Sequence, residues 1–279
     1  MSQFNEYLTL EAEASSLLND MKSLLNNKLY SDVKFAIGNE KVLFHAHRCI
    51  LALRCQIFAD MFKEMPITDE PFLFPDLQSD AFMLVLEFIY TNKCNVLKSD
   101  VIFVLSTALE FGVMELVKVC EKYFEENVTL ETACQAMQAA VTFGLDSFKR
   151  SLLPFFRQNT AEIFNTSSFN ELSEETLAYI LQDDELNMDE YDIIKAVENW
   201  TLVNSVALDK PASEVSRSVV CNVRLPLLSS DELAEIECLN VKNHFIPIEQ
   251  ISLAWKHIAL KTPLNASFET TPRTGTRIR

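Results

Sequence analysis

The chain has 279 residues, 48% of them hydrophobic, and its 40 acidic against 24 basic side chains give a formal net charge of −16 at pH 7. A surface of this charge repels phosphate backbones, which argues against nucleic acid as a direct partner. At roughly 150 residues per domain, the length predicts two packed domains.

Sequence motifs for nucleotide binding and hydrolysis are missing. The four glycines are scattered, so none of them forms a Gly-rich loop that could hold a phosphate. The G-x-S-x-G nucleophile elbow is absent as well, and only four histidines are present as general bases. The sequence therefore predicts no enzymatic activity and no cofactor.

Cysteine usage indicates the compartment. The seven cysteines include no Cys-x-x-Cys pair and are spread over apolar segments of a long chain, which favours reduced, intracellular thiols. Residues 1–16 lack the pattern of a secretory signal, and no uncharged apolar run approaches the roughly 18 residues of a membrane span. We expect a soluble protein of the cytoplasm, or alternatively of the nucleus, that does not bind membranes.

Residues 15–47 predict a helix followed by a β-hairpin. Apolar side chains recur at helical spacing over residues 15–25, up to two asparagines. Residues 31–47 then alternate on both sides of a turn at Gly38 and Asn39, which is typical of a hairpin with one buried face.

A helical period returns at Arg48 and predicts one buried helix. Its two adjacent apolar ridges are Leu51, Cys55, Phe58 and Phe62, and Ile50, Leu53, Ile57 and Met61. Downstream, residues 71–75 indicate a short strand between prolines, and Ser79 is the candidate N-cap of a further helix. The first domain is therefore predicted to be mixed.

From residue 101 the chain reads as helical and repeats itself with an offset of 32 residues. In each copy an apolar helix ends at a glycine, Gly112 or Gly144, that can adopt the left-handed conformation, and a second helix follows at once. Because one helical hairpin cannot bury both its faces, the two copies predict stacked hairpins that lead into an all-helical second domain.

An acidic stretch lies between residues 161 and 194, where ten acidic side chains occur without a single Lys or Arg. Runs of like charge usually lie on solvated surfaces. We therefore expect these carboxylates at exposed helix ends and in loops.

Two sets of residues resemble known domains. The first set resembles a BTB (POZ) domain and consists of Ser31-Asp32-Val33-x-Phe35, Phe44-x-Ala46-His47-Arg48-x-Ile50-Leu51-Ala52, Phe58-x-x-Met61-Phe62, and Ala81-Phe82 with Leu86-Glu87-Phe88-Ile89-Tyr90-Thr91. The second set resembles the BACK domain that commonly follows a BTB domain and consists of Phe169-x-x-Leu172, Leu177, Ile180-Leu181-x-Asp183, Leu186, Glu190, Trp200 and Val223-Arg224-Leu225-Pro226-Leu227-Leu228. The resemblance implies an α+β BTB domain, a small sheet with helices, followed by an all-α BACK domain of stacked helical hairpins.

We divide the chain into five parts on this basis. They are an N-terminal dimerisation helix region at 1–24, the BTB domain at 25–127, the BACK domain at 128–235, a helical extension at 236–261 and a disordered tail at 262–279. The tail is predicted to be disordered because it contains Thr, Pro and Arg without an apolar period.

The resemblance also implies self-association. BTB domains usually form homodimers through the N-terminal helix and the first strand, and the apolar stripe of the predicted helix agrees, since it has to be buried. The expected interface residues are Leu17, Leu18, Met21 and Leu24, with Asp32 and Arg48 in a charged pocket. If buried, these two charges need each other; the alternative is an ordinary solvated surface pair.

Many BTB-BACK proteins are substrate adaptors of a cullin-RING ubiquitin ligase. The family's cullin-binding loop carries a hydrophobic residue followed two places later by Glu; here Phe62 and Glu64 have that spacing one turn early, and Met65 stands at the expected place without the Glu. No kelch propeller or zinc-finger array follows the BACK segment. We therefore rank a homodimeric, non-catalytic scaffold first, and an adaptor that joins a cullin to an unknown protein substrate second.

Residues 45–55, HAHRCILALRC, leave a third interpretation open. His45 and His47 are two apart on a strand and share a face, as zinc ligands can, but no fourth ligand is evident. Cys49 begins a helix beside Arg48 and is the candidate reactive thiol for redox or electrophile sensing, provided that it is exposed. Packing and hydrogen bonding are commoner roles for such residues, so we predict neither a metal nor a cofactor.

Overall fold

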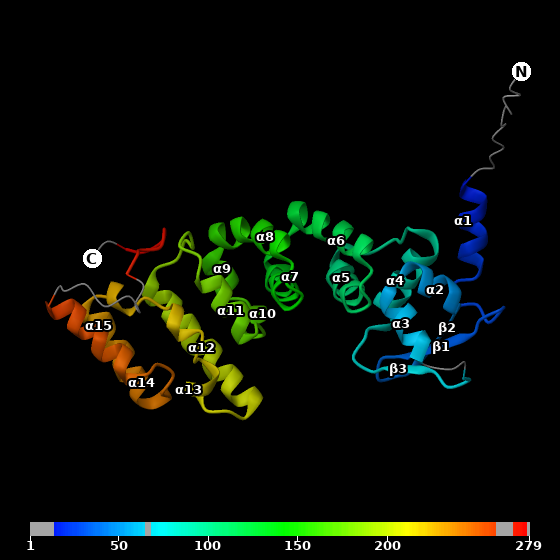
Figure 1. Cartoon of the computed structure of the whole chain (residues 1–279). Coiled ribbons are helices and arrows are strands. Elements are labelled where there is room, and N and C mark those ends of the chain that lie inside the picture. The colour runs from blue at the N-terminus through cyan, green and yellow to red at the C-terminus, as the bar shows by residue number, and fades with distance from the viewer. Residues whose placement is uncertain (1–13, 65–67, 261–269, 278–279) are drawn as a thin grey trace, which may run out of the picture. The chain divides into compact units, whose positions relative to one another are not determined.

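The computed structural model describes residues 14–64, 68–260 and 270–277. The chain divides into two compact units, Met1–Lys122 and Tyr123–Arg279. The first contains a small sheet with helices and the second is helical, which confirms the predicted fold class (Figure 1).

The sheet of the first unit has three strands in the order β2-β1-β3. Strands β1 (Val33–Ile37) and β2 (Val42–Ala46) form the predicted antiparallel hairpin, and β3 (Phe72–Phe74) pairs with β1 in parallel. Ile37 lies opposite Val42, so the loop has four residues, 38–41, rather than a turn of two. Gly38 at its start has a φ of 73°, which glycine adopts without strain.

Helices α2 to α5 also belong to the first unit, and three of them, α2 to α4, lie together on one side of the sheet (Figure 1). Their bounds are Arg48–Arg54 for α2, Gln56–Glu64 for α3, Ser79–Thr91 for α4 and Val101–Glu110 for α5, which follows the 3-10 helix η1 at Lys98–Asp100. The N-cap position of α4 is Gln78, which makes no side-chain cap hydrogen bond, so the prediction of Ser79 as the cap is wrong.

The single buried helix predicted from Arg48 onward is two helices, interrupted at Cys55. The backbone of Cys55 is extended (φ −144°, ψ 117°), and its Sγ donates to the carbonyl oxygen of Phe111 at 2.8 Å. The interruption leaves Leu51, Cys55 and Phe58 in the core, whereas Leu53 is 85% exposed. The second ridge therefore does not contribute a continuous buried face.

Aromatic rings fill the core under the sheet. The ring of Phe35 on the central strand lies 5.5 Å from that of Phe58 and 5.4 Å from that of Phe82, and Phe58 stacks on Phe111 at 4.8 Å. These four side chains are at most 1% exposed. Because the rings come from β1, α3, α4 and the end of α5, the same contacts fix the sheet and its helices against each other.

Helix α6 (Met114–Asn127) crosses the boundary between the two units. The remaining elements of the second unit are α7 (Leu130–Thr142), α8 (Asp146–Gln158), α9 (Thr160–Phe164), α10 (Ser167–Asn170), α11 (Glu174–Leu181), α12 (Glu190–Leu208), α13 (Ala212–Val215), the 3-10 helices η2 (Val220–Asn222) and η3 (Leu225–Leu227), α14 (Ser230–Asn243) and α15 (Ile248–Leu260). No helix in the described part of the chain combines the length and the apolar character needed to cross a bilayer.

The predicted repeat corresponds to two helical hairpins, α5-α6 and α7-α8. Gly112 and Gly144 stand at equivalent turns with φ values of 64° and 66°. The equivalence does not extend to every side chain, since Phe111 is 1% exposed and its counterpart Phe143 is 44% exposed. The left-handed turn therefore favours glycine at both positions, whereas the adjacent phenylalanines have different surroundings.

Candidate functional site

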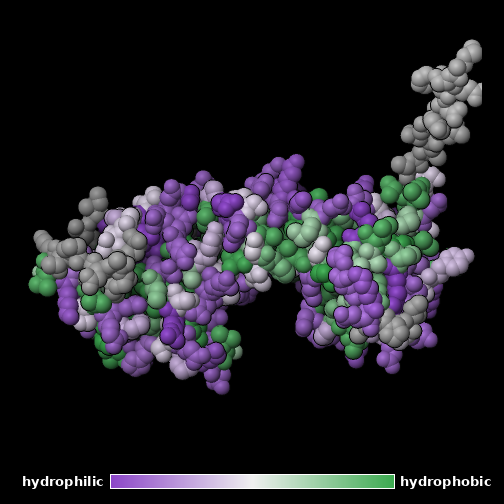
Figure 2. Space-filling model, viewed as in Figure 1, coloured by the Kyte–Doolittle hydropathy of each residue, from purple (hydrophilic) through white to green (hydrophobic). Residues whose placement is uncertain are grey.

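The N-terminal helix α1 (Ala14–Ser23) carries apolar side chains on its surface (Figure 2). Leu17 is 66% exposed and Leu18 is 42% exposed, whereas Met21 and Leu24 are half-buried. The helix contacts α4, where Lys22 Nζ lies 2.7 Å from Glu87 Oε1. One edge of the helix thus packs on the first unit and leaves two predicted interface leucines available to another surface.

Asp32 and Arg48 meet at the corner between β1 and α2. The Asp32 carboxylate accepts a hydrogen bond from the backbone N–H of Arg48 at 2.7 Å, while the Arg48 guanidinium lies over the ring of Phe62, 4.9 Å from its centroid. A carboxylate at a helix N-terminus satisfies a free N–H and interacts favourably with the helix dipole. Asp32 therefore acts as an N-terminal cap supplied from outside the helix, a role that the sequence prediction did not include.

His47 is a buried junction of the same corner, 5% exposed. Its Nε2 lies 2.8 Å from the carbonyl oxygen of Leu29, which only accepts, so this nitrogen carries the proton. Its Nδ1 then accepts from the Tyr90 hydroxyl at 2.8 Å, and the Tyr90 oxygen in turn accepts the His47 backbone N–H at 3.0 Å. The arrangement joins the end of the hairpin to α4.

These contacts bear on the proposed metal site in residues 45–55. Both ring nitrogens of His47 are occupied by protein groups, so in this arrangement His47 cannot join His45 in holding a metal ion. Burial, helped by Lys28 and Lys34, lowers the pKa of His45. Among the described residues, no group of three or more His, Cys, Asp or Glu is placed to hold a metal.

The cysteines of this stretch differ in their surroundings. Cys49 is exposed at the start of α2, which meets the condition set for a reactive thiol. Cys55 is buried, and burial raises the pKa of its thiol. Only Cys49 of the two is accessible to a reagent in solution, and its reactivity stays a prediction.

The three residues named for a cullin contact have different surroundings. Phe62 is half-buried and its ring lies 5.8 Å from that of Phe58, so it contributes to packing of the first unit. Glu64 is exposed at the end of α3. Met65 lies outside the described residues. The contact itself stays a prediction.

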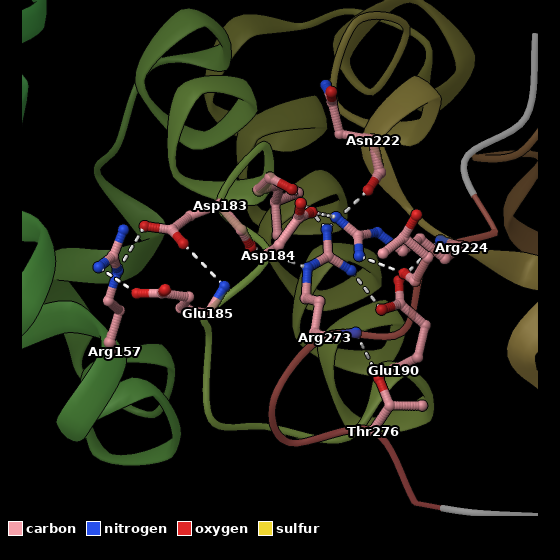
Figure 3. Close-up of polar contacts among 11 residues, drawn as sticks. Arg157, Asp183, Asp184, Glu185, Glu190, Asn222, Arg224, Arg273 and Thr276 are labelled. Carbon is pink, nitrogen blue, oxygen red and sulfur yellow. Dashed lines mark hydrogen bonds and ion pairs between the residues drawn. The ribbon is translucent and has the colours of Figure 1, made fainter.

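The acidic stretch contradicts the expectation of a uniformly solvated surface. Asp189 is 4% exposed and Glu190 is 0% exposed, because arginines from distant parts of the chain pair with them. Figure 3 shows adjacent carboxylates that face opposite ways: Asp183 faces Arg157, and Asp184 faces Arg224. The stretch lacks bases of its own, and its partners come from elsewhere in the second unit.

Arg157 of α8 forms the outer part of this network. Its Nε lies 2.9 Å from Asp183 Oδ2, and its Nη1 pairs with Glu185. The hydrogen bond to Asp183 raises the pKa of Arg157. The Asp183 carboxylate also accepts a hydrogen bond from the backbone N–H of Glu185 at 2.8 Å, which fixes the bend that follows α11.

Arg273 forms the inner part, and it comes from the predicted disordered tail. Its side chain and that of Glu190 are both 0% exposed and pair directly (Figure 3). The expectation of disorder is therefore wrong for residues 270–277, which we call the tail segment; residues 262–269 and 278–279 lie outside the described residues. Composition failed here because one buried arginine holds the segment, with no need for an apolar period.

Comparison with known proteins agrees with this architecture. The chain matches the family model for the BTB/POZ domain over residues 21–128 and the model described as BTB And C-terminal Kelch, abbreviated BACK, over residues 133–237. The chain belongs to the BTB/POZ family and carries a BACK domain after the BTB domain. Its domains are thus those of a protein-interaction module.

Individual relatives sharpen the assignment. BTB/POZ domain-containing protein 19 of Bos taurus is 36% identical over 256 residues, which are 91% of this chain and 88% of the relative. BTB/POZ domain-containing protein 9 of Drosophila melanogaster is 30% identical over 78% of this chain and 29% of its own length. Kelch-like protein 26 of Danio rerio is 27% identical over 80% of this chain and 36% of its own length.

Proposed function

We propose that the protein is a homodimeric scaffold that binds other proteins and catalyses no reaction itself. The observation that carries the proposal is the apolar surface of α1, where Leu17 and Leu18 are exposed beside a unit with a closed aromatic core. The helix occupies the position at which BTB domains commonly self-associate, and the BTB and BACK domains together support a role in protein recognition.

The free energy gained by burying Leu17 and Leu18 in a dimer is enough for one part of an interface. Covering a leucine side chain fully contributes about 1.5–3 kcal/mol, and a two-fold interface counts each residue twice. Since Leu17 and Leu18 are about half exposed, their four copies contribute roughly 3–6 kcal/mol against an association cost of about 4–15 kcal/mol. The apolar stripe therefore needs neighbouring surface, such as the corner at Asp32, to form a stable dimer.

A pair of matched variants tests the dimer interface. The double variant Leu17→Glu/Leu18→Glu places charges in the proposed interface, and light scattering during gel filtration is expected to show a monomer. The control is Leu97→Glu, since Leu97 is 70% exposed in the same unit but lies outside the proposed interface. A control that dissociates as readily, or a double variant that stays dimeric, would contradict this interface.

An adaptor role in a cullin-RING ubiquitin ligase is the second candidate. It is supported by the match to a Kelch-like protein over 80% of this chain and by the exposure of Glu64 at the end of α3. The packing of Phe62 against Phe58 weakens it, because a half-buried ring offers a partner only part of its surface. A pull-down with purified cullin scaffolds decides: saturable binding below micromolar concentration that is lost in Glu64→Lys would place the adaptor role first.

We also place the protein in the cytoplasm, with the nucleus as the alternative compartment, and assign it no cofactor. All seven cysteines are free thiols, in agreement with a reducing environment. Imaging of the tagged full chain in living cells tests the compartment; accumulation in a secretory organelle would contradict it.

A further inference from the structure

The tail segment, residues 270–277, lies along the loop between α11 and α12 without forming a helix or a strand. Three of its backbone N–H groups are bonded to this loop and to the start of α12. The N–H of Thr274 donates to Asp184 O at 3.0 Å, that of Gly275 to Leu186 O at 3.1 Å, and that of Arg277 to Asp189 Oδ2 at 2.8 Å. Residues 273–276 form a turn, closed by a hydrogen bond from the Thr276 N–H to the Arg273 carbonyl oxygen at 3.0 Å. Main-chain hydrogen bonds combined with side-chain pockets are a recurring mode of peptide recognition by proteins.

The Arg273 guanidinium enters a site that matches its shape. Nη1 pairs with Glu190, Nη2 donates to the carbonyl oxygens of Leu181 and Asn222, and Nε donates to that of Asp183 at 3.3 Å. We call these four acceptors the arginine site. They are spread around a planar fork of donors, so a lysine ammonium, which is a point charge on a flexible stem, cannot reach all of them.

Two further positions of the segment are selective. A Cβ at Gly275 would lie 2.1 Å from the backbone nitrogen of Met188, so only glycine fits there. Arg277 is largely exposed, and its Nη2 lies 3.2 Å from Asp192 Oδ2. The segment is therefore read as Arg-x-Gly-x-Arg, with a buried arginine, an obligatory glycine and an outer arginine.

Contacts within the second unit, and not only the bound arginine, hold the arginine site in place. Glu190 at the start of α12 also accepts the backbone N–H of Arg224 at 2.7 Å, and Asp189 caps α12 by accepting from Tyr191 N at 3.1 Å. A buried carboxylate without a cation is strongly unfavourable. The site therefore requires an arginine whenever it is closed to water.

We propose that this surface of the second unit is a recognition site for Arg-x-Gly-x-Arg segments, which the chain's own tail segment occupies and thereby closes to partner proteins carrying the same pattern. Nine residues, 261–269, join the tail segment to α15. Because the tail segment is covalently attached to the unit that it binds, its docking is intramolecular, and a partner protein binds only when it outcompetes or displaces the tail. The inference goes beyond the scaffold function and does not depend on self-association.

Binding of a labelled peptide to the full chain tests the proposal. The probe is a fluorescein-labelled peptide with the sequence of residues 270–277, followed by fluorescence anisotropy. The Arg273→Ala chain is expected to bind it saturably, and the wild-type chain at least tenfold more weakly, because its own tail competes. A peptide in which alanine replaces the first arginine is expected to bind neither chain. Equal binding to both chains, or none to a folded Arg273→Ala chain, overturns the proposal.

A second measurement covers the outcome in which Arg273→Ala fails to fold. Residues 262–268 of the full chain are replaced by a protease recognition sequence, and the purified, folded protein is then cut. The proposal predicts that the released fragment co-elutes with the protein and is displaced by excess peptide, whereas displacement fails when alanine replaces the first arginine of the peptide. Unfolding on cleavage, or retention of the fragment in millimolar peptide, shows that the segment is an integral part of the core and overturns the proposal.

Discussion

Arg273 and Glu190, 83 residues apart in the chain, form an ion pair in which neither side chain is exposed to solvent. The pair fixes the tail segment to the start of α12 and converts part of an acidic stretch into a binding site. Burial lowers the pKa of Arg273, while the neighbouring Glu190 carboxylate opposes that shift. Removal of either partner leaves the other charge buried without compensation, which strongly destabilises the folded state.

Glu190→Ala is expected to release the tail segment. Loss of a partner from a buried ion pair is destabilising by about 3–5 kcal/mol, and undocking lets Arg273 return to water. Hydrogen exchange at the amides of Thr274 and Gly275 should therefore accelerate at least a hundredfold. The control is Glu185→Ala, since Glu185 is exposed and pairs with Arg157 instead. Unchanged exchange in Glu190→Ala contradicts the role of the pair.

Gly275→Ala is expected to prevent docking by steric conflict alone. The added methyl would lie 2.1 Å from the backbone nitrogen of Met188, and a backbone contact of this kind cannot be relieved by a side-chain rotation. Trypsin should then cleave after Arg273 within minutes under conditions in which the wild-type chain is protected. The neighbouring Thr274→Ala, at an exposed position, serves as the control and should behave as wild type.

Tyr90→Phe is expected to lower the free energy of unfolding by about 1–3 kcal/mol, because the buried His47 backbone N–H and Nδ1 lose their partner. Urea denaturation at neutral pH measures the change. Thr107→Ser, which keeps the hydroxyl of a buried threonine in the same unit, should change stability by less. A loss below about 0.5 kcal/mol in Tyr90→Phe would contradict the junction described for this corner.

The same tyrosine predicts a dependence on alkaline pH. Burial raises the pKa of Tyr90 above its ordinary value of 10.0. A raised folded-state pKa contributes stability that is fully present below pH 10 and is lost as the pH rises above it. The wild-type chain should therefore lose more stability than Tyr90→Phe when the pH is raised from 9 to 12. Parallel losses in the two proteins would exclude Tyr90 as a source of the effect.

Alkylation is expected to distinguish the thiols. Burial raises the pKa of Cys134 to about 11 and that of Cys120 to about 12, so both stay protonated near neutral pH, whereas Cys49 is exposed. Brief treatment of the folded protein with iodoacetamide, followed by mass spectrometry, should label Cys49 and leave Cys120 and Cys134 unmodified. Exposed Cys221 is the internal reference, and preferential labelling of Cys221 would sink the assignment of Cys49 as the reactive thiol.

Periodicity predicted the elements whose apolar residues all face one core. Val33, Phe35 and Ile37 alternate and form the central strand, and Gly112 and Gly144 mark two helical hairpins. The interruption at Cys55 was missed because the apolar ridge continues through it. The break coincides with a tertiary contact, the hydrogen bond from the Cys55 thiol to the Phe111 carbonyl oxygen, which local spacing does not encode.

The candidate sites were predicted less completely than the fold. Asp32 and Arg48 were expected as a charged pair at a dimer interface, which stays a prediction. The hydrogen bond that joins them involves the Arg48 backbone, which side-chain charge does not indicate. The pairing of Arg273 with Glu190 joins two segments far apart in sequence. The available signal was charge complementarity between an acidic stretch without Lys or Arg and a tail segment, residues 270–277, that has two arginines and no acidic residue. This signal appears only when the two segments are considered together.

Self-association is the central claim, and sedimentation equilibrium of the full-length chain at micromolar concentration tests it most directly. The chain mass is 31.8 kDa, so a homodimer predicts a sedimenting mass of about twice this value. The dimer should dissociate in Leu17→Glu/Leu18→Glu and persist in Leu97→Glu. A wild-type chain that sediments as a stable monomer of 31.8 kDa across the micromolar range would contradict the account.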